Sequence, residues 1–374
     1  MKHSKLYTSK LPTSVRDLPA RAGRYWRKNW WHKVLCVLAA TLMLCVGTMY
    51  GIAQWYIHSE RSQPLVLGTS FIPAYAESLG LNAQDTLDTL IGQVGVRNFR
   101  LVSYWDQLEP SPGQYDFSLL DWQFQKIEAA HGTITLSLGL RQPRWPECHV
   151  PAWVGSEPES TWQPQLEKFM ATVVNRYKTS PALKSYQVEN EYFLHGFGLC
   201  TSLVGAGATY DRARLVSEYN LVKKLDPTRT AIVNRSDNAI GISVGNPRPD
   251  ELGISIYKRV WSPPIGRYYE YPFPAWFYGF VAGTQKLATG RDTIIHELQA
   301  EAWPPHGQSI TQTSLAEQKK SLDAKRLEGR IKYGEGTGMR QIYLWGSEYW
   351  VYRQKVLHDD SLVHVAAAHF SKDK

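Results

Sequence analysis

The sequence predicts an α/β fold, in the form of a (β/α)8 (TIM) barrel preceded by a single N-terminal transmembrane helix. A long uncharged apolar segment lies near the N-terminus, and strand-like and helix-like segments alternate through the rest of the chain. Strands that alternate with helices form parallel sheets, and eight such strands suit a closed barrel. A doubly wound sheet is the alternative, but no glycine-rich phosphate loop follows any strand.

Four regions follow from this pattern. Residues 1–33 form a basic tail, 34–57 the transmembrane helix, 58–64 a linker and 65–374 the barrel. The chain has 42 Lys and Arg against 34 Asp and Glu, and the tail alone carries nine of the bases with one acid. Because the remainder is neutral, the basic pI gives no reason to expect a nucleic-acid partner.

The apolar segment from Val34 to Ile57 contains no charged residue, and about 20 apolar residues suffice to cross a bilayer. Basic residues on its N-terminal side place the tail in the cytoplasm, and Trp and Tyr flank both ends. We therefore expect a single-pass cell-membrane protein that contacts lipid through residues 34–57 and carries an extracytoplasmic barrel. A cleaved signal peptide is the alternative, since Gly51-Ile52-Ala53 fits a small-residue cleavage site.

Two cysteines lie in the expected exported part of the chain. Cys148 follows the third strand and Cys200 the fourth, and neighbouring barrel strands bring their loops side by side. A Cys148–Cys200 disulfide is therefore expected in an oxidising compartment. Cys36 and Cys45 lie inside the apolar segment, where we expect small apolar fillers.

Apolar periodicity and turn residues predict the positions of the strands and helices. Expected strands cover 65–71, 96–105, 133–140 and 185–193, begin at 231 and 253, and cover 293–297 and 339–345. Expected helices cover 83–91, 117–130, 164–177, 210–224, 314–333 and 358–369. The aromatic-rich segment 261–280 is expected to form a loop over the cleft, where it stacks on sugar, packs on a long loop or touches a membrane.

Polar residues mark the C-terminal ends of these strands, where a barrel builds its active site. The fourth strand ends at Asn190-Glu191 and the seventh at Glu297. Arg100 lies in the second strand, Tyr257 ends the sixth and Trp345 ends the eighth. A pair of carboxyls beside an aromatic platform is what cleavage of a glycosidic bond requires.

Two neighbouring acids and one possible glycosylation sequon leave alternatives open. Glu301 has the same strand parity as Glu297, so the pattern does not exclude it as the nucleophile. Glu189 shares parity with Glu191, and as a buried acid it needs a partner, for which Arg100 is a candidate. Asn234-Arg235-Ser236 fits a glycosylation sequon but directly follows an apolar strand, so we expect a chance match.

Three segments resemble the clan A glycoside hydrolases. The segments 99–117 and 187–192 resemble cellulase-like (family 5) and β-galactosidase-like (families 35 and 42) members, and 295–299 resembles their nucleophile strand. His296 departs from the pattern, because many members have Thr there.

The resemblance implies a (β/α)8 barrel and hydrolysis with retention. It implies Glu191 as acid/base and Glu297 as nucleophile, with Asn190 bonding the sugar 2-hydroxyl. It further implies that Arg100 and Tyr257 hold the nucleophile, and that Trp345 lies under the sugar ring.

The predicted function is a membrane-anchored retaining glycoside hydrolase that cleaves O-glycosidic bonds of an extracytoplasmic glycan by double displacement. Its partner would be an oligo- or polysaccharide. No His, Cys and Asp cluster has metal-ligand spacing, and this hydrolysis needs no cofactor. A non-catalytic carbohydrate-binding barrel and a transglycosylase remain alternatives.

Overall fold

The structure is a computed structural model, and it describes residues 30–371 apart from 156, 193, 195–211 and 237–244. The chain divides after Gly51 into two compact units, and the second unit, Ile52–Lys374, contains the barrel.

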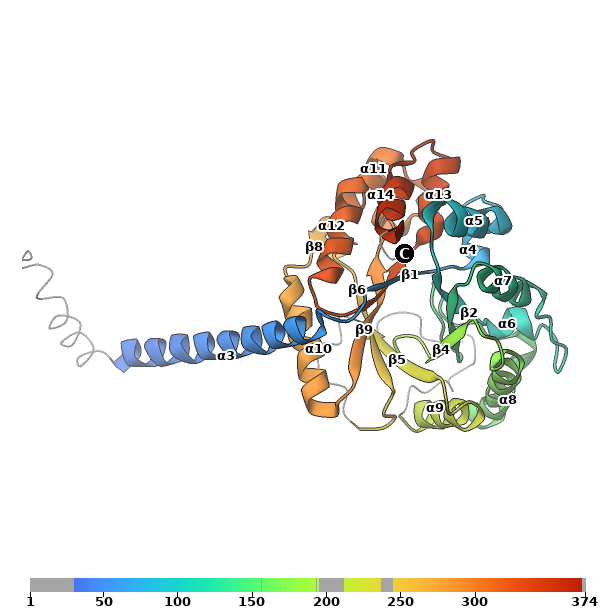
Figure 1. Cartoon of the computed structure of the whole chain (residues 1–374), viewed down its shortest axis with the longest axis horizontal. Coiled ribbons are helices and arrows are strands. Elements are labelled where there is room, and N and C mark those ends of the chain that lie inside the picture. Colours follow the sequence, from blue (N-terminus) through green and yellow to red (C-terminus); the bar gives the residue numbers. More distant parts are fainter. Residues whose placement is uncertain (1–29, 156, 193, 195–211, 237–244, 372–374) are drawn as a thin grey trace, which may run out of the picture. The chain divides into compact units, whose positions relative to one another are not determined.

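Eight parallel strands close into a barrel in the order β1-β10-β9-β6-β5-β4-β3-β2, which confirms the predicted (β/α)8 fold (Figure 1). Each predicted strand overlaps one barrel strand. The strands are β1 (Val66–Ser70), β2 (Asn98–Val102), β3 (Thr133–Leu138), β4 (Leu183–Val188), β5 (Thr230–Ser236), β6 (Glu251–Ile256), β9 (Asp292–Gln299) and β10 (Gln341–Trp345).

Helices surround these strands (Figure 1). They are α4 (Pro73–Ser78), α5 (Ala83–Thr89), α6 (Trp105–Leu108), α7 (Ser118–Ala129), α8 (Glu159–Tyr177), α9 (Arg212–Leu225), α10 (Ala275–Thr289), α11 (Leu315–Ser321), α12 (Ala324–Glu335), α13 (Ser347–Lys355) and α14 (Ser361–Phe370). A short π-helical turn, Leu90–Val94, continues α5.

One helix prediction was wrong, and one largely buried helix was missed. The single helix expected over 314–333 breaks into α11 and α12, because Leu322 is extended at φ −145° and Asp323 caps the second helix by accepting from the Arg326 N–H. Helix α13 was not predicted. All its residues from Ser347 to Arg353 are buried, so it lacks the alternation of apolar and polar faces that marks a surface helix.

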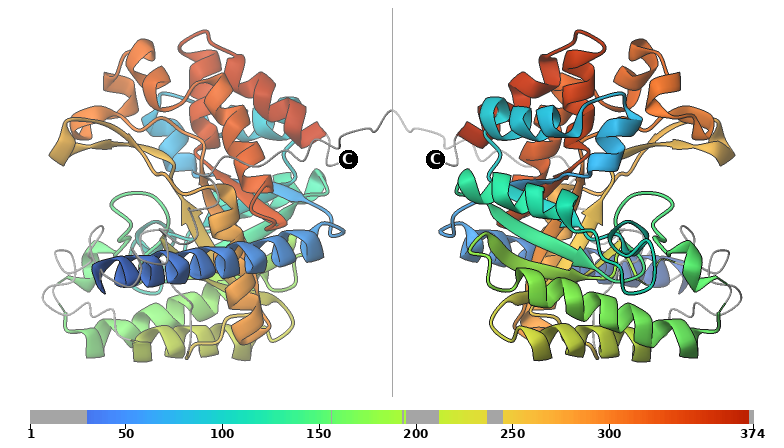
Figure 2. Two further views of the ribbon diagram at one scale, coloured as in Figure 1. Left: turned by 90° about the vertical axis from the view of Figure 1, so that its left-hand side faces the viewer. Right: turned by 90° about the vertical axis from the view of Figure 1, so that its right-hand side faces the viewer.

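The aromatic segment between β6 and β9 is more regular than the predicted loop. Strands β7 (Arg259–Ser262) and β8 (Arg267–Glu270) form an antiparallel hairpin, which extends outward from the end of the barrel (Figure 2). The loop expected over 261–280 was wrong for Ala275 to Phe280, which lie in α10. Pro274 precedes this helix and Gly290, at φ +72°, follows it.

Helix α3 (Trp30–Glu60) is 31 residues long. It is long and apolar enough to cross a membrane, and a signal sequence near the N-terminus can be as long and as apolar. From Ile52 onward the helix belongs to the barrel unit. Tyr56 is buried there, and Glu60 pairs with Lys286 of α10 at 2.6 Å.

Candidate active site

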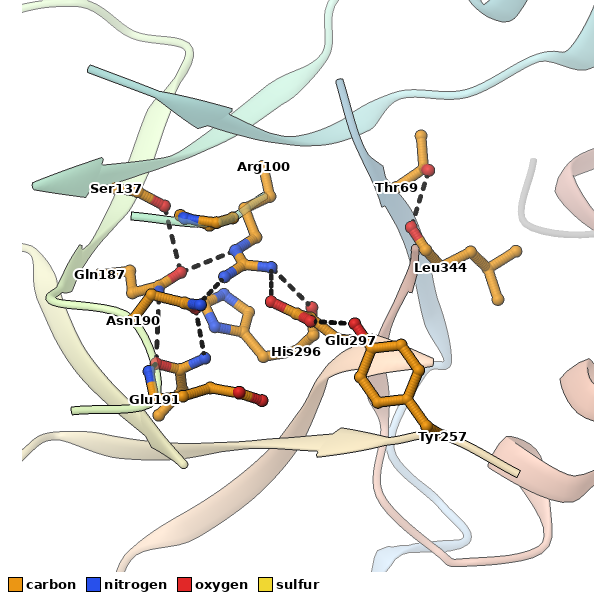
Figure 3. Close-up of polar contacts among 12 residues, drawn as sticks. Thr69, Arg100, Ser137, Gln187, Asn190, Glu191, Tyr257, His296, Glu297 and Leu344 are labelled. Carbon is orange, nitrogen blue, oxygen red and sulfur yellow. Dashed lines mark hydrogen bonds and ion pairs between the residues drawn. The ribbon is translucent and has the colours of Figure 1, made fainter. Parts of the chain in front are cut away.

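Arg100, on β2, is the centre of a hydrogen-bond network at the C-terminal end of the barrel (Figure 3). Its side chain is fully buried. Nε donates to Gln187 Oε1 at 2.7 Å, Nη1 to Glu297 Oε1 at 2.7 Å and Nη2 to Asn190 Oδ1 at 2.8 Å. One guanidinium therefore fixes three side chains: Gln187 on β4, Asn190 just after β4, and Glu297 on β9.

Glu297 lies between two donors. Besides the Arg100 contact to Oε1, Oε2 accepts from the Tyr257 hydroxyl at 2.6 Å. Burial and the charge of Glu297 hold the pKa of Tyr257 well above its usual value, so this phenol stays protonated as a donor. A charged and a neutral donor together stabilise an ionised carboxylate in a buried position. The predicted grouping of Arg100, Tyr257 and Glu297 is present.

Asn190 is oriented by three donors to its Oδ1. These are Arg100 Nη2, Gln187 Nε2 at 3.0 Å and Asn234 Nδ2 at 3.0 Å. Because the oxygen is engaged, the amide nitrogen is the part of Asn190 that remains for a ligand in the cleft it lines. An N–H₂ group presented in this way suits a sugar hydroxyl.

Glu191 has a different environment from Glu297. Its backbone adopts a left-handed φ of +42°, its N–H donates to Asn234 Oδ1 at 2.9 Å and its carbonyl accepts from Arg141 Nη1 at 3.0 Å. Oε1 of its carboxyl is buried without a hydrogen-bond partner among the described residues. Burial, followed by the negative charge of Glu297, raises the pKa of Glu191 to about 8. The group is thus protonated at neutral pH.

Glu189 does not pair with Arg100, so that prediction was wrong. Its carboxylate accepts the N–H groups of Leu140 and Arg141, each at 2.8 Å, and lies 3.9 Å from Arg214. Strand β4 ends at Val188 and Glu189 has a φ of +60°, so strand parity no longer applies. Gly139 makes room for the carboxylate, since a Cβ there would lie 2.7 Å from Glu189 Oε1.

Glu301 lies beyond the end of β9, outside the Arg100 network. It accepts from the Tyr75 hydroxyl at 2.7 Å and from Arg144 Nη1 and Nη2 at 3.0 and 3.1 Å. It lines the same cleft as Glu297 but touches neither Arg100 nor Tyr257 in the described contacts. The geometry favours Glu297 over Glu301 as nucleophile, and the assignment stays a prediction.

Trp345 ends β10 and lines the cleft, as expected of a platform. It is only 6% exposed, and the Arg144 guanidinium lies 4.4 Å from its ring centroid. Little of its ring surface therefore remains for a sugar.

The site opens into a cleft of about 650 Å³. Its described lining residues are Arg144, Trp145, Glu147, Asn190, Glu191, Leu194, Ser236, Tyr257, Val260, Trp261, Ser262, Pro263, Tyr269, Tyr271, Glu297, Glu301, Trp303 and Trp345. Both predicted catalytic carboxyls open into it, and the hairpin contributes aromatic side chains, as expected of the segment after the sixth strand.

Sequence reasoning missed several residues of the site. Asn234, dismissed as part of a chance sequon, is buried and holds both Asn190 and Glu191. Gln187 lies in β4, and the alternation of inward and outward side chains along a strand could have placed it inside the barrel. His296 is fully buried, and burial lowers its pKa well below the usual range, so it is neutral beside Arg100.

Cys148 lies buried in the loop after β3 and is disulfide-bonded. Cys200 lies outside the described residues, so the Cys148–Cys200 pairing stays a prediction. Cys36 and Cys45 are free thiols on α3.

Comparison with known proteins supports the resemblance. A family model described as beta-galactosidase, glycoside hydrolase family 42, matches residues 83–225, which include Arg100, Asn190 and Glu191. No curated protein matches the sequence.

Among solved structures, a beta-galactosidase from the Antarctic haloarchaeon Halorubrum lacusprofundi matches at TM-score 0.55 and 14% identity, over 83% of this chain and 58% of its own. The exo-beta-1,4-mannosidase Op5Man5 from Opitutaceae bacterium strain TAV5 matches at TM-score 0.52 and 14% identity, over 83% of this chain and 60% of its own. Xylanase 10B from Thermotoga petrophila RKU-1 matches at TM-score 0.50 and 12% identity, over 83% of this chain and 95% of its own.

The chain spans about three fifths of the length of the mannosidase and of the beta-galactosidase. At these identities the solved structures establish the fold. Together with the family match over residues 83–225, they confirm the resemblance of this (β/α)8 barrel to the clan A glycoside hydrolases.

Proposed function

We propose that the chain is a membrane-anchored retaining glycoside hydrolase, which cleaves O-glycosidic bonds of an extracytoplasmic glycan by double displacement. The observation that carries the proposal is the contrast between two carboxyls in one cleft. Glu297 is held by Arg100 and Tyr257, whereas the pKa of Glu191 is raised to about 8 by burial and by the charge of Glu297. An ionised and a protonated carboxyl are the pair that glycoside cleavage uses.

In the first step, a carboxylate oxygen of Glu297 attacks the anomeric carbon, and the bond from that carbon to the leaving oxygen breaks. Glu191 gives its proton to that oxygen, so the leaving group departs as an alcohol. Glu297 becomes a glycosyl ester and Glu191 becomes a carboxylate. The Asn190 amide donates to a sugar hydroxyl beside the reacting carbon.

In the second step, Glu191 takes a proton from water as the water oxygen attacks the anomeric carbon and releases Glu297. The change in role has a physical cause. The charge of Glu297 is the second contribution to the raised pKa of Glu191, and esterification removes that charge. The pKa of Glu191 therefore falls in the intermediate, where the residue must act as a base.

The similar structures guide the choice of substrates to test. They are a beta-galactosidase, an exo-beta-1,4-mannosidase and a xylanase. We infer a β-linked sugar for this chain too, and a suitable panel consists of aryl β-galactosides, β-mannosides and β-xylosides with the matching β-1,4-oligosaccharides.

Variants at the two carboxyls test the mechanism. Glu191→Ala should impair substrates with poor leaving groups far more than activated aryl glycosides, since general acid help is worth about 10²–10⁴-fold. Azide should restore turnover of this variant and yield a glycosyl azide of retained configuration. Glu297→Ala should abolish turnover, without a retained azide product.

Glu301→Ala is the matched control, because Glu301 lines the cleft without touching Arg100 or Tyr257. If Glu301→Ala loses as much turnover as Glu297→Ala, and azide gives no retained product with it, Glu301 is the nucleophile. If the wild-type protein binds oligosaccharides, hydrolyses nothing on the panel and binds equally well as the double alanine variant, the chain is a carbohydrate-binding barrel.

The membrane anchor is the second part of the proposal. It rests on the uncharged segment of α3 and on the nine basic residues of the tail. Protease added to intact cells should digest the barrel and spare an N-terminal tag that stays with the membrane. Loss of the tag from the mature protein would show a cleaved signal peptide, and protection of the barrel would contradict the topology.

A further inference from the structure

We propose that Trp145 forms a sugar-binding subsite at the cleft, and that the substrate is a neutral oligosaccharide with at least one sugar beyond the two joined by the cleaved bond. The inference rests on the proposed function and extends it to the class of substrate.

Trp145 presents an open aromatic surface to the cleft that holds Glu191 and Glu297. Its side chain is 71% exposed, whereas Trp303 and Trp345, which line the same cleft, are 38% and 6% exposed. Tryptophan is highly buried on average in folded proteins. A flat apolar ring with a polar edge is suited to pack against the apolar face of a sugar ring.

The loop that carries Trp145 is closed on itself by three contacts. Arg141 Nε pairs with Glu147 Oε2 at 2.5 Å, and the Gln142 N–H donates to the Glu147 carbonyl at 2.8 Å. The Glu147 N–H in turn donates to the Arg144 carbonyl at 2.7 Å. The tryptophan therefore stands on a short loop whose two ends are bound to each other.

Arg144, the residue before Trp145, fixes the loop to the barrel. Both its terminal nitrogens donate to Glu301, and its guanidinium lies 3.4 Å from the ring centroid of Tyr75. Arg144 has a φ of +84° and Glu147 a φ of +65°, left-handed conformations that cost free energy for residues other than glycine. Such strain gathers at ligand sites that are held in place by their surroundings. A platform fixed in this way loses little entropy when a sugar binds.

The charges of the cleft indicate a neutral sugar. Arg144 is the one Lys or Arg among the described lining residues, and both its terminal nitrogens are engaged by Glu301. A uronic acid or sulfated sugar would find no unpaired cation in the described lining to offset the loss of its hydration.

The test compares substrates of different length on the full chain in a mild detergent. Trp145→Ala should lower kcat/KM for the β-1,4-linked tetrasaccharide of the accepted sugar about tenfold, which corresponds to about 1.4 kcal/mol. The same variant should change kcat/KM for the aryl monoglycoside less than about twofold. Trp145→Phe, which keeps a flat ring, should recover most of the loss. Leu287→Ala is the control, because Leu287 is 60% exposed on α10 and does not line the cleft.

Binding measured in the Glu297→Gln background separates this inference from the proposed function. By calorimetry with galacto-, manno- and xylotetraose, adding Trp145→Ala should weaken the tightest complex about tenfold. Equal losses on long and short substrates, or no loss on either, would overturn the subsite while leaving the hydrolase in place. If the wild-type protein hydrolyses nothing but its tetraose binding depends on Trp145, the subsite stands and the proposed hydrolase fails.

Discussion

Replacing Glu191 with glutamine should stabilise the protein, by an amount that grows with pH. Burial and the charge of Glu297 raise the pKa of Glu191 from 4.5 to about 8. Between these values the folded chain keeps a proton that the unfolded chain has lost, so this residue's contribution to stability falls as pH rises. Glutamine resembles the protonated acid in shape and is neutral at every pH, so it removes this cost.

The magnitude follows from the two pKa values at about 1.36 kcal/mol per unit. Relative to wild type, Glu191→Gln should gain about 1 kcal/mol in free energy of unfolding at pH 5, about 3 at pH 7 and about 5 at pH 9. Below pH 4.5 the Glu191 carboxyl is protonated in both the folded and the unfolded chain, so the wild type and Glu191→Gln should be equally stable. Urea unfolding of the full chain in a mild detergent, at each pH, measures the difference.

Glu189→Gln is the matched control, two residues away. The Glu189 carboxylate accepts two backbone N–H groups, so the NH₂ group of a glutamine in its place would face one of these N–H donors without an acceptor between them. This variant should be destabilised by about 1–3 kcal/mol at every pH. A gain for Glu191→Gln that does not change with pH, or a loss that deepens as pH rises, would refute the protonated state of Glu191.

Three further predictions concern the network and its surroundings. The kcat/KM of the wild type should fall above an apparent pKa of about 8 that belongs to the coupled carboxyl pair, and Glu191→Ala should lose this alkaline limb on activated aryl glycosides. Arg100→Lys should lower kcat/KM by about 10²-fold or more with a folded protein by circular dichroism, because an ammonium cannot bond Gln187, Asn190 and Glu297 in the guanidinium geometry; near-normal kinetics would contradict the network. Non-reducing peptide mapping of the wild-type chain should recover Cys148 linked to Cys200, and two free thiols would rule the bond out.

The barrel was predictable because its strands repeat a local pattern. Apolar runs at regular spacing, separated by helical segments, require no knowledge of distant contacts, and all eight strands were found in this way. The buried helix α13 and the hairpin β7–β8 were missed for the opposite reason. Helix α13 is buried from Ser347 to Arg353 and so shows no exposed polar face there, and the hairpin's many aromatic residues do not alternate clearly with polar ones.

The candidate site was predictable where strand ends alone decide it. Asn190, Glu191 and Tyr257 follow their strands and Glu297 lies two residues before the end of β9, and the structure brings all four to one cleft. The left-handed φ of Glu189 turns its carboxylate away from Arg100, the expected partner. The residue type at position 189 does not predict that conformation. The pair Arg144–Glu301 joins residues 157 positions apart, which no local spacing reveals.

The configuration of the first-formed product tests the central claim most directly. Proton NMR of an early time course, on a β-glycoside that the wild-type protein hydrolyses, distinguishes the anomers before they equilibrate. Double displacement by Glu297 and Glu191 predicts that the β-anomer appears first. An α-anomer appearing first would mean that water attacks the anomeric carbon directly, and would contradict the role of Glu297 as nucleophile.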